Sequence, residues 1–580
     1  MCSEKLKTFL TEKNITPTGI RKFFSLRLTV FIATLTLSWL FRFTADVWAF
    51  DNSCFRGMAA VGEVLSAGKN YLALLQSWIL WCGIYALGCW TLPEKVNNVL
   101  LAVFVAAEVL LSVTDCFMVV RYSCPMKDMI VILRATDQQE IREYFSAMFG
   151  QGNAAVPLLL SLLVLIVSGG VFYLLHKLKT APERAVSAVI FFFCAALTLF
   201  FPGENTLRDH PDPLWSFAVN FNTRDHFLTM AARTTASPVL PPEVKDILTG
   251  NATPVYGIVI AGESDSRARH SLYGHNKDTD IFLRKSRASG MICFTDTISA
   301  TASTMHSIYF MFTNARILNK YAAPDYGICE YIRHAGGTVS LHDMQRSHGA
   351  WSSMMALLFV NADRKRAYSD DGKNHFDGEL LVPVCNEITA AGDRQAQLLV
   401  LHLMGSHYDQ NFRVPEAWKQ EHAKFLTGMD AYDRSIVYTG FILSRIHAAT
   451  EKITRPAFVL YIPDHSEEPL SRRSMTTPEA VYYEIPMLLY FNAAYRKQFP
   501  QTVALARKAA AKPFQTDLSL PLIARLMQIP EQMIAAEDDL LSPAYRPPRR
   551  KVAWGEEDYI PFPPIAERRY FHRINKIPAE

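Results

Sequence analysis

The sequence lacks a large excess of charge of either sign, since 59 lysines and arginines accompany 55 acidic residues among 580 positions, giving a formal net charge of +4. The electrostatic field of so small a net charge does not indicate nucleic acid as the main partner. The ten cysteines include no C-x-x-C pair, which excludes a structural zinc ribbon and a small disulfide-rich fold. An aromatic content of 12% and only 27 glycines exclude disorder and collagen-like repeats.

Half of the residues are hydrophobic and only 20% are charged, which is more apolar than an ordinary large soluble enzyme. Nearly all long uncharged runs fall before about residue 203. Each run is close to the roughly 20 residues that cross a hydrocarbon core, so the sequence predicts five transmembrane helices. These predicted spans are 28–50, 70–92, 97–120, 156–175 and 185–201.

The distribution of lysine and arginine predicts the orientation of these spans. Basic residues precede the first predicted span. A second group, Lys177, Lys179 and Arg184, lies between the last two predicted spans. The positive-inside rule places the N-terminus and that loop in the cytoplasm, so five spans leave the C-terminal part outside, whereas four would leave it in the cytosol. We expect a transmembrane domain over 1–203, a proline-rich connector over 204–250 and a globular domain over 251–580.

The globular domain shows short apolar runs that end abruptly in polar residues, with helical patterns between them, as at 432–446. Strands that alternate with helices predict α/β layers around a mainly parallel sheet. In such sheets, functional sites form at the carboxyl ends of the strands. The predicted strands are 255–261, 337–341, 398–403, 458–462 and 486–491.

Three of these strands end in candidate ligands. Glu263 follows the first strand, His402 and His407 accompany the end of the third, and Asp464 with His465 follows the fourth. Taken alone, an Asp-His pair after a strand is more often a helix cap than a metal ligand. Together, however, glutamate, aspartate and histidine suit zinc or manganese, and three protein ligands leave a coordination position open.

A serine- and threonine-rich run at 297–307 precedes a helical apolar segment that continues through Phe312. A hydroxyl there would lie at a helix N-terminus, where backbone N–H groups and the helix dipole favour an anion such as a phosphoryl group. The hydroxyl could then act as a nucleophile. Simple helix capping by Ser303 or Thr304 is the alternative interpretation.

These segments, in this order behind five predicted spans, resemble the membrane-bound phosphoethanolamine transferases of Gram-negative bacteria, within the alkaline-phosphatase/sulfatase-like superfamily. The resemblance implies a multi-pass inner-membrane enzyme whose catalytic α/β domain is periplasmic. The most specific motifs are Gly262-Glu263-Ser264, the threonine loop, His402-Leu-Met-Gly-Ser-His407, and Asp464-His465 with Glu467.

The resemblance also implies a zinc-dependent reaction, with manganese the less suitable metal. Glu263, Thr304, Asp464 and His465 would hold the zinc, and Thr304 would be the nucleophile. Thr304 would attack phosphatidylethanolamine, release diacylglycerol and carry phosphoethanolamine as a phosphothreonine-type intermediate. The acceptor would be lipopolysaccharide, at a core sugar or lipid A, or another envelope glycan.

By the same resemblance, several polar residues would contact the substrate. His407 and His402 would contact the phosphate, and His407 would take part in catalysis by donating a hydrogen bond or shuttling a proton. Glu467 belongs to the same motif as the metal ligands. The segment after the second strand would bind the headgroup through Asp343, Gln345 and His348.

The sequence departs from the lipid A-modifying branch in two respects. That branch has cysteines flanking the nucleophile loop, where this chain has Ala300 and Phe310, and a histidine before the last core strand, where this chain has Glu484. These departures favour the branches that modify lipopolysaccharide core sugars or glucans. Three cysteines lie in the globular domain and cannot all pair internally, namely Cys293, Cys329 and Cys385.

Other functions are less compatible with the motifs. A sulfatase needs a C/S-x-P-x-R arrangement around a cysteine or serine nucleophile, and no cysteine here provides one. A glycerol-phosphate transferase of the lipoteichoic-acid-synthase type shares five spans and a threonine nucleophile. A non-catalytic, lipid-binding regulator with a sulfatase-like domain is the alternative from a different class.

Overall fold

The structure is a computed structural model, and it describes residues 226–561 with short gaps, together with scattered residues between 79 and 111 and at 192–193. The gaps are 250–252, 320–321, 346–353, 369–374, 391–394, 409, 468–479, 548–550 and 555–557. The five predicted spans fall largely outside the described residues, so their number stays a prediction. None of the helices that the structure describes is both long and apolar enough to span a membrane.

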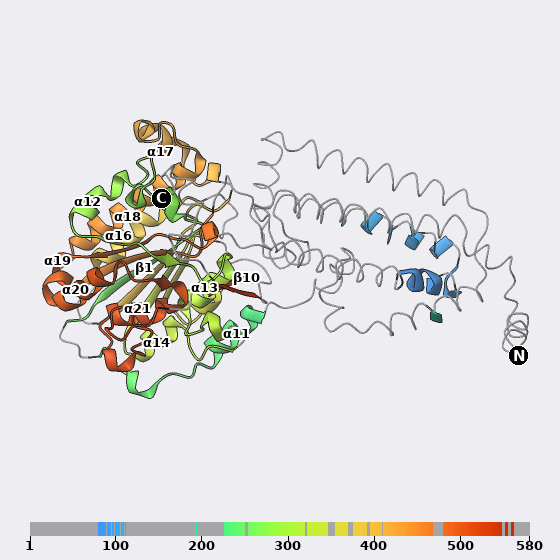
Figure 1. Ribbon diagram of the computed structural model, residues 1–580, viewed down its shortest axis with the longest axis horizontal. Helices are drawn as coiled ribbons and strands as arrows, with labels where there is room; N and C mark the ends of the chain where they lie inside the picture. Colours follow the sequence, from blue (N-terminus) through green and yellow to red (C-terminus); the bar gives the residue numbers. More distant parts are fainter. Residues whose placement is uncertain are drawn as a thin grey trace, which may run out of the picture. The chain divides into compact units, whose positions relative to one another are not determined.

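The chain divides into two compact units, and nearly all described residues belong to the second, Arg224–Ser471 with Thr476–Glu580. A seven-stranded sheet forms the centre of this unit, in the order β2-β8-β7-β1-β6-β4-β5 (Figure 1). The strands are β1 (Tyr256–Gly262), β2 (Ile292–Phe294), β4 (Thr338–Asp343), β5 (Arg364–Ala367), β6 (Gln397–His402), β7 (Ala457–Pro463) and β8 (Met487–Phe491).

The five predicted strands correspond to β1, β4, β6, β7 and β8, and the prediction of a mainly parallel α/β sheet is confirmed. The pairs β7–β1, β1–β6, β6–β4 and β4–β5 are parallel, whereas β8 pairs antiparallel with both β7 and β2. Every residue of β1 and β7 is buried, as expected for central parallel strands that are covered on both faces.

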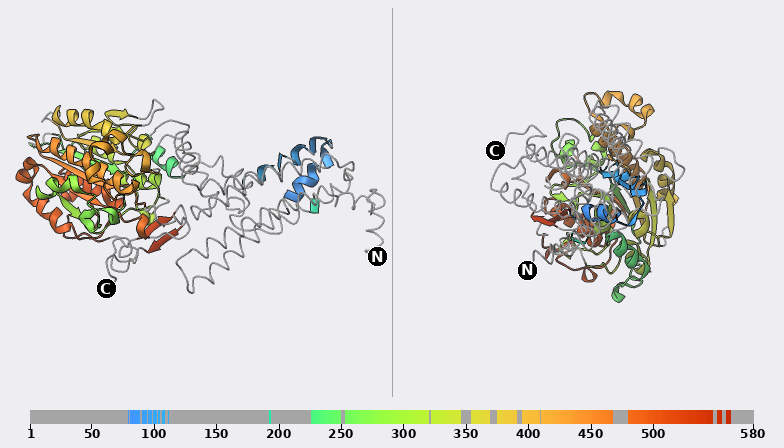
Figure 2. Two further views of the ribbon diagram at one scale, coloured as in Figure 1. Left: turned by 90° about the horizontal axis from the view of Figure 1, so that it is seen from above. Right: turned by 90° about the vertical axis from the view of Figure 1, so that its right-hand side faces the viewer.

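Helices cover both faces of the sheet and form two hydrophobic clusters (Figures 1 and 2). Alternate residues of β1 face opposite clusters, with Val259 in one and Ile260 in the other. The first cluster takes side chains from α11 (His226–Ala236), α13 (Thr304–Phe312), α14 (Ile328–His334), α15 (Met354–Leu358), α19 (Ala493–Gln498), α20 (Pro500–Ala509) and α21 (Ser519–Leu526). The second takes them from α16 (Leu381–Ala390), α17 (Glu416–Glu421) and α18 (Ala431–Glu451).

Helix α11 lies within the predicted connector over 204–250. Its Phe227, Met230 and Ala231 are buried in the first cluster, and the Phe227 ring packs against the Tyr309 ring of α13 with centroids 5.1 Å apart. This part of the predicted connector therefore belongs to the core of the second unit.

Two smaller sheets of two strands each accompany the central sheet in the described unit. Strand β3 (Thr297–Ile298) pairs with β9 (Phe514–Gln515), and β10 (Lys551–Trp554) pairs with β11 (Asp558–Pro561).

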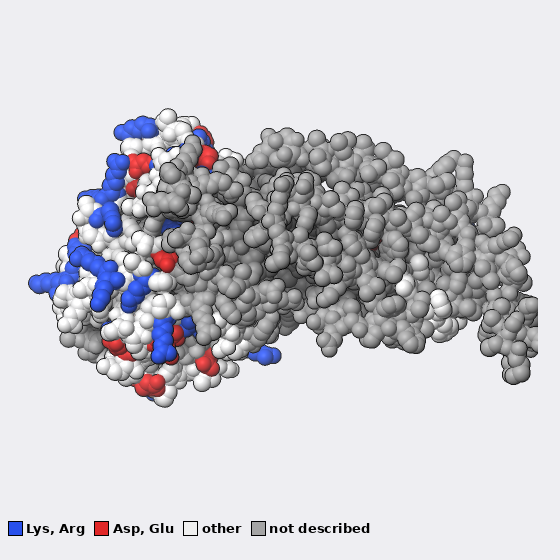
Figure 3. Space-filling view, in the orientation of Figure 1, with Lys and Arg blue, Asp and Glu red and all other residues white. Residues whose placement is uncertain are grey.

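Figure 3 shows lysine and arginine side chains over α12 (Arg284–Ala288), α19 and α20. Basic residues occupy the last turns of these helices, where they complement the helix dipoles.

The described cysteines are all free, including Cys293 in β2, Cys329 in α14 and Cys385 in α16. The described part of the chain is therefore stabilised by its packed clusters, without a disulfide.

Candidate active site

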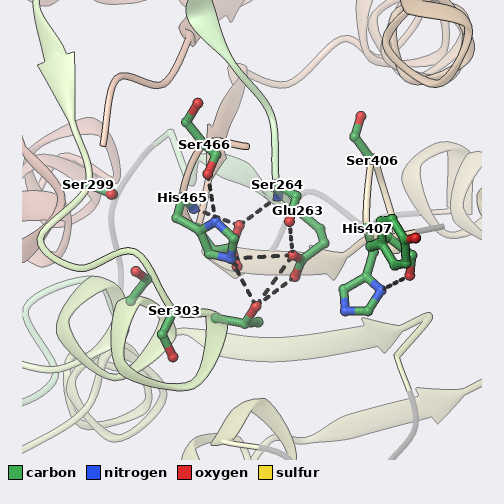
Figure 4. Close-up of polar contacts among 12 residues, drawn as sticks. Glu263, Ser264, Ser299, Ser303, Ser406, His407, His465 and Ser466 are labelled. Atoms are coloured by element: carbon green, nitrogen blue, oxygen red, sulfur yellow. Dashed lines mark hydrogen bonds and ion pairs between the residues drawn. The ribbon is translucent and has the colours of Figure 1, made fainter. Parts of the chain in front are cut away.

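The carboxyl ends of the neighbouring strands β1 and β7 bring three candidate ligands together. Ala261 pairs with Ile462 and Gly262 with Pro463, so Glu263 and the Asp464-His465 pair leave the sheet at the same level. One oxygen or nitrogen atom from each of these three residues lies within 4.8 Å of the others (Figure 4). As predicted, the ends of these strands bring the three side chains together at one edge of the sheet.

Thr304 begins α13 and points its hydroxyl into this group. Its Oγ1 lies 3.1 Å and 3.3 Å from the two carboxylate oxygens of Glu263 and 3.3 Å from His465 Nε2. Ser303 occupies the N-cap position, but its side chain makes no capping hydrogen bond. The helix-capping interpretation of this hydroxyl run therefore does not describe Thr304.

The three candidate ligands Glu263, Asp464 and His465 are buried. Burial raises the pKa of Asp464, although the backbone N–H groups of Ser264 and His465 donate to its Oδ1 at 2.9 Å and 2.6 Å. Two buried carboxylates beside one imidazole form a donor set of the oxygen–nitrogen kind that divalent zinc or manganese favours. A bound divalent cation would supply the positive charge that these carboxylates need.

A strained turn directs Glu263 into the site. Ser264 has φ = 53°, a left-handed conformation that is uncommon for a residue other than glycine. In this conformation its N–H reaches Asp464 Oδ1 and its hydroxyl donates to Glu263 Oε1 at 2.5 Å. Tyr432 of α18 fixes the same turn, since its hydroxyl donates to the Ser264 carbonyl at 2.6 Å and accepts from the Ser266 N–H at 2.9 Å.

The end of β4 adds a second group of polar residues beside the ligands. Asp343 Oδ1 lies 2.9 Å from His402 Nδ1, because these residues are register partners in β4 and β6. Burial by itself would lower the pKa of His402, but the Asp343 carboxylate, with Glu263 and Asp464, raises it overall. His402 Nε2 has no hydrogen-bond partner among the described residues. Gln345 donates its amide to Glu263 Oε2 at 2.9 Å.

The other predicted substrate residues lie at the periphery or outside the description. Figure 4 shows His407 apart from Glu263 and His465, with its Nδ1 2.8 Å from the Tyr408 carbonyl oxygen. Glu467 is half-buried two residues after His465. His348 lies outside the described residues.

Glu484, which occupies the position of a histidine in the lipid A-modifying branch, is held by an ion pair. Its Oε1 lies 3.0 Å from Arg267 Nη2, and both side chains are only 1% exposed. The Arg267 N–H also donates to the Glu484 carbonyl at 3.1 Å. The sequence does not indicate the partner of Glu484, which lies more than 200 residues away.

Sequence reasoning missed a buried histidine, His270, a few residues after the turn that carries Glu263. His270 lies between two carboxylates, 2.8 Å from Asp265 and 2.7 Å from Asp280, and Tyr461 of β7 donates to Asp265 at 2.6 Å. Burial alone would lower the pKa of His270, but these two carboxylates raise it well above its usual value. No sequence signal distinguishes this histidine, since its partners are set by the turn after β1.

Several known proteins are similar to this chain. Residues 256–518 match the sulfatase family. Phosphoethanolamine transferase EptA of Helicobacter pylori is 23% identical over 368 residues, which cover 58% of this chain and 68% of that protein.

Two solved structures are similar in fold. The C-terminal periplasmic domain of EptC from Escherichia coli, in complex with zinc, matches with a TM-score of 0.50 and 17% identity over 57% of this chain and 99% of that one. The integral membrane protein lipooligosaccharide phosphoethanolamine transferase A from Neisseria meningitidis matches with a TM-score of 0.57 and 16% identity, over 90% of this chain and 99% of that one. The described unit therefore has a sulfatase-like α/β fold.

Proposed function

Because the chain carries a sulfatase-family domain and is related to the phosphoethanolamine transferases, we propose that it transfers phosphoethanolamine from phosphatidylethanolamine to lipopolysaccharide or another envelope glycan. The observation that carries the proposal is the position of the Thr304 hydroxyl, 3.1 Å from Glu263 and 3.3 Å from His465. A hydroxyl at a helix N-terminus and inside a metal-ligand group is suited to nucleophilic attack on phosphorus.

The residues present fit zinc better than manganese, because an imidazole joins the two carboxylates. Glu263, Asp464 and His465 would hold the ion, with Thr304 as the fourth ligand. When bound, the ion would lower the pKa of the threonine hydroxyl and offset charge on the phosphoryl oxygens.

The reaction would proceed in two displacements at phosphorus. In the first, Thr304 Oγ1 forms a bond to phosphorus, the bond from phosphorus to the diacylglycerol oxygen breaks, and diacylglycerol leaves with a proton. In the second, an acceptor oxygen forms a bond to phosphorus and Thr304 Oγ1 is released and protonated again. The protein therefore carries phosphoethanolamine only as a phosphothreonine-type intermediate.

His402 is suited to bind the phosphoryl group. Burial lowers the pKa of His402, but the Asp343 carboxylate more than offsets this effect, which favours the protonated imidazole. Its Nε2 has no hydrogen-bond partner among the described residues. The imidazolium could donate this N–H to a phosphoryl oxygen. His407 and Glu467 would contact the substrate or acceptor at the rim, and the headgroup would bind near Asp343 and His348.

We further propose an inner-membrane location, with five transmembrane helices over 1–203, a cytoplasmic N-terminus and a periplasmic catalytic domain. The uncharged runs and the distribution of basic residues support this topology. A core-sugar or glucan acceptor is supported by Ala300 and Phe310, which stand where the lipid A-modifying branch has cysteines, and by Glu484, which is paired with Arg267.

Mass spectrometry of the full-length protein tests the proposal directly. After incubation with phosphatidylethanolamine and zinc, we expect a phosphoethanolamine adduct of about 123 Da on the peptide that contains Thr304. A glycerol-phosphate adduct formed from phosphatidylglycerol would instead support the polymerase alternative. No adduct in zinc-loaded protein with either lipid would support the non-catalytic regulator.

A further inference from the structure

The amide group of Gln345 is held against the candidate metal ligand Glu263. Its Nε2 donates to Glu263 Oε2 at 2.9 Å and to the Leu403 carbonyl at 3.0 Å. An amide nitrogen carries two N–H groups, so both are used by these contacts. The Gln345 backbone N–H also donates to Asp343 Oδ1 at 3.0 Å, which fixes where the side chain starts.

The sheet order explains why a long side chain is needed here. Gln345 follows β4, Leu403 follows β6, and Glu263 follows β1, and these three strands are consecutive neighbours in the sheet. The side chain therefore extends from the end of β4 past the end of β6 to the residue after β1. Asparagine, which is one methylene shorter, would not make both contacts.

Gln345 and Ser264 restrain different oxygens of the Glu263 carboxylate. Oε2 accepts from Gln345, and Oε1 accepts from the Ser264 hydroxyl at 2.5 Å. Each carboxylate oxygen thus has one donor that is not itself a candidate metal ligand. Rotation of the carboxylate would break at least one of these hydrogen bonds.

We propose that Gln345 is a positioning residue that orients Glu263 toward the metal, an assignment that rests on the metal-dependent function proposed above. It takes the place of the headgroup-binding role that the resemblance implies for Gln345. Both amide protons are engaged, so only the amide oxygen could meet the ammonium of the headgroup, and the KM measurement below tests that contact. Partners of this kind fix the orientation of a metal ligand, and their removal typically weakens metal binding by about 10- to 100-fold.

The test is the zinc affinity of the full-length protein, measured by competition with a chromophoric chelator. Gln345→Leu keeps the approximate volume and removes both donors, and we expect zinc binding to weaken by about 10- to 100-fold. Gln345→Asn should weaken binding similarly. At saturating zinc, the KM of Gln345→Leu for phosphatidylethanolamine should equal that of the unmodified protein, because no headgroup contact is lost.

Gln395→Leu is the matched control. The Gln395 amide donates to the Gly336 carbonyl at 2.9 Å, before the start of β6 and therefore at the opposite end of that strand from the site. We expect no change in its zinc affinity. Thermal unfolding of the metal-free proteins checks that both leucine variants fold.

The outcomes separate this inference from the proposed function. Unchanged zinc affinity in Gln345→Leu together with a raised KM for the lipid would overturn the inference and restore the headgroup role. Weakened zinc binding in a protein that forms no adduct from phosphatidylethanolamine would support the inference and refute the proposed function. If the unmodified protein binds no zinc, both are refuted.

Discussion

At the scale of single residues, the Thr304 hydroxyl is the feature on which the proposed chemistry depends. Thr304→Ala should abolish the adduct and lower transfer by about 10³-fold or more, because no other oxygen replaces the nucleophile. Zinc binding should persist through Glu263, Asp464 and His465, which the substitution leaves in place. Thr304→Ser retains a hydroxyl and should keep measurable turnover. Adduct formation in folded Thr304→Ala would contradict this role for Thr304.

Asp433 provides a pH-dependent test of stability away from the metal ligands. Burial tends to raise its pKa, but the nearby His275, the hydrogen bond from Lys277 and the charge of Arg269 lower it to about 2, from 3.8. Its ionised form therefore stabilises the fold fully above about pH 4, and this contribution disappears as the pH falls toward 2. Asp433→Asn should lose on the order of 2 kcal/mol at pH 7.

Denaturant unfolding over a pH series measures this difference. The free energies of unfolding of the unmodified protein and Asp433→Asn should converge between about pH 4 and pH 2. A difference that stays constant over that interval would show that Asp433 acts through packing instead of through its charge.

The residue types at the site are predictable from the sequence, but their contacts are not. Glu263, Asp464 and His465 stand directly after apolar strands, so their convergence follows from parallel pairing. Thr304 is one hydroxyl among several in its run, and only the resemblance distinguishes it before its position in α13 is known. The Gln345 contact depends on the order of β4, β6 and β1, which local sequence patterns do not specify.

At the scale of elements, the buried pair of Arg267 and Glu484 connects the segments that carry the site. Arg267 belongs to the turn after β1, and its guanidinium also donates to the Thr295 carbonyl ahead of β3. The Ser299 N–H, after β3, donates to the carbonyl of Tyr483 at 2.8 Å, next to Glu484. The loop that leads to the nucleophile is thereby attached to the turn that carries Glu263.

Glu484→Gln should therefore be strongly destabilising, because it leaves Arg267 buried without a counter-charge. We expect a loss of about 3–5 kcal/mol in the free energy of unfolding, measured with denaturant. The double variant Arg267→Met with Glu484→Leu removes both charges and should recover most of that stability. Equal stability of Glu484→Gln and the unmodified protein would mean that the pair is not needed.

The elements that sequence reasoning missed have physical reasons for being missed. Strand β5 reads Arg-Lys-Arg-Ala and is exposed, as is common for an edge strand protected by charge, so no apolar run marks it. The apolar run of β8 resembles those of the parallel strands β1 and β7, so nothing in it indicates that β8 runs antiparallel to β7. Helix α11 is surrounded by prolines, which made the whole of 204–250 look like a connector.

At the scale of the whole molecule, the second unit contains everything that the candidate site requires. Both hydrophobic clusters are built from residues 227–545, and the three candidate metal ligands and Thr304 lie within the same unit. Residues 1–203 contribute none of these side chains.

A protein that consists of residues 224–580 should therefore unfold cooperatively and bind zinc within about threefold of the full-length affinity, since the ligands and their hydrogen-bond partners are all retained. Transfer from phosphatidylethanolamine in vesicles should fall much more steeply than transfer from a water-soluble short-chain analogue, because only transfer from vesicles needs the predicted transmembrane helices. Calorimetry, chelator competition and the two transfer assays measure these quantities. Equal losses with both donors would place part of the active site in residues 1–223, and failure to unfold cooperatively would show that the second unit depends on the first for its fold.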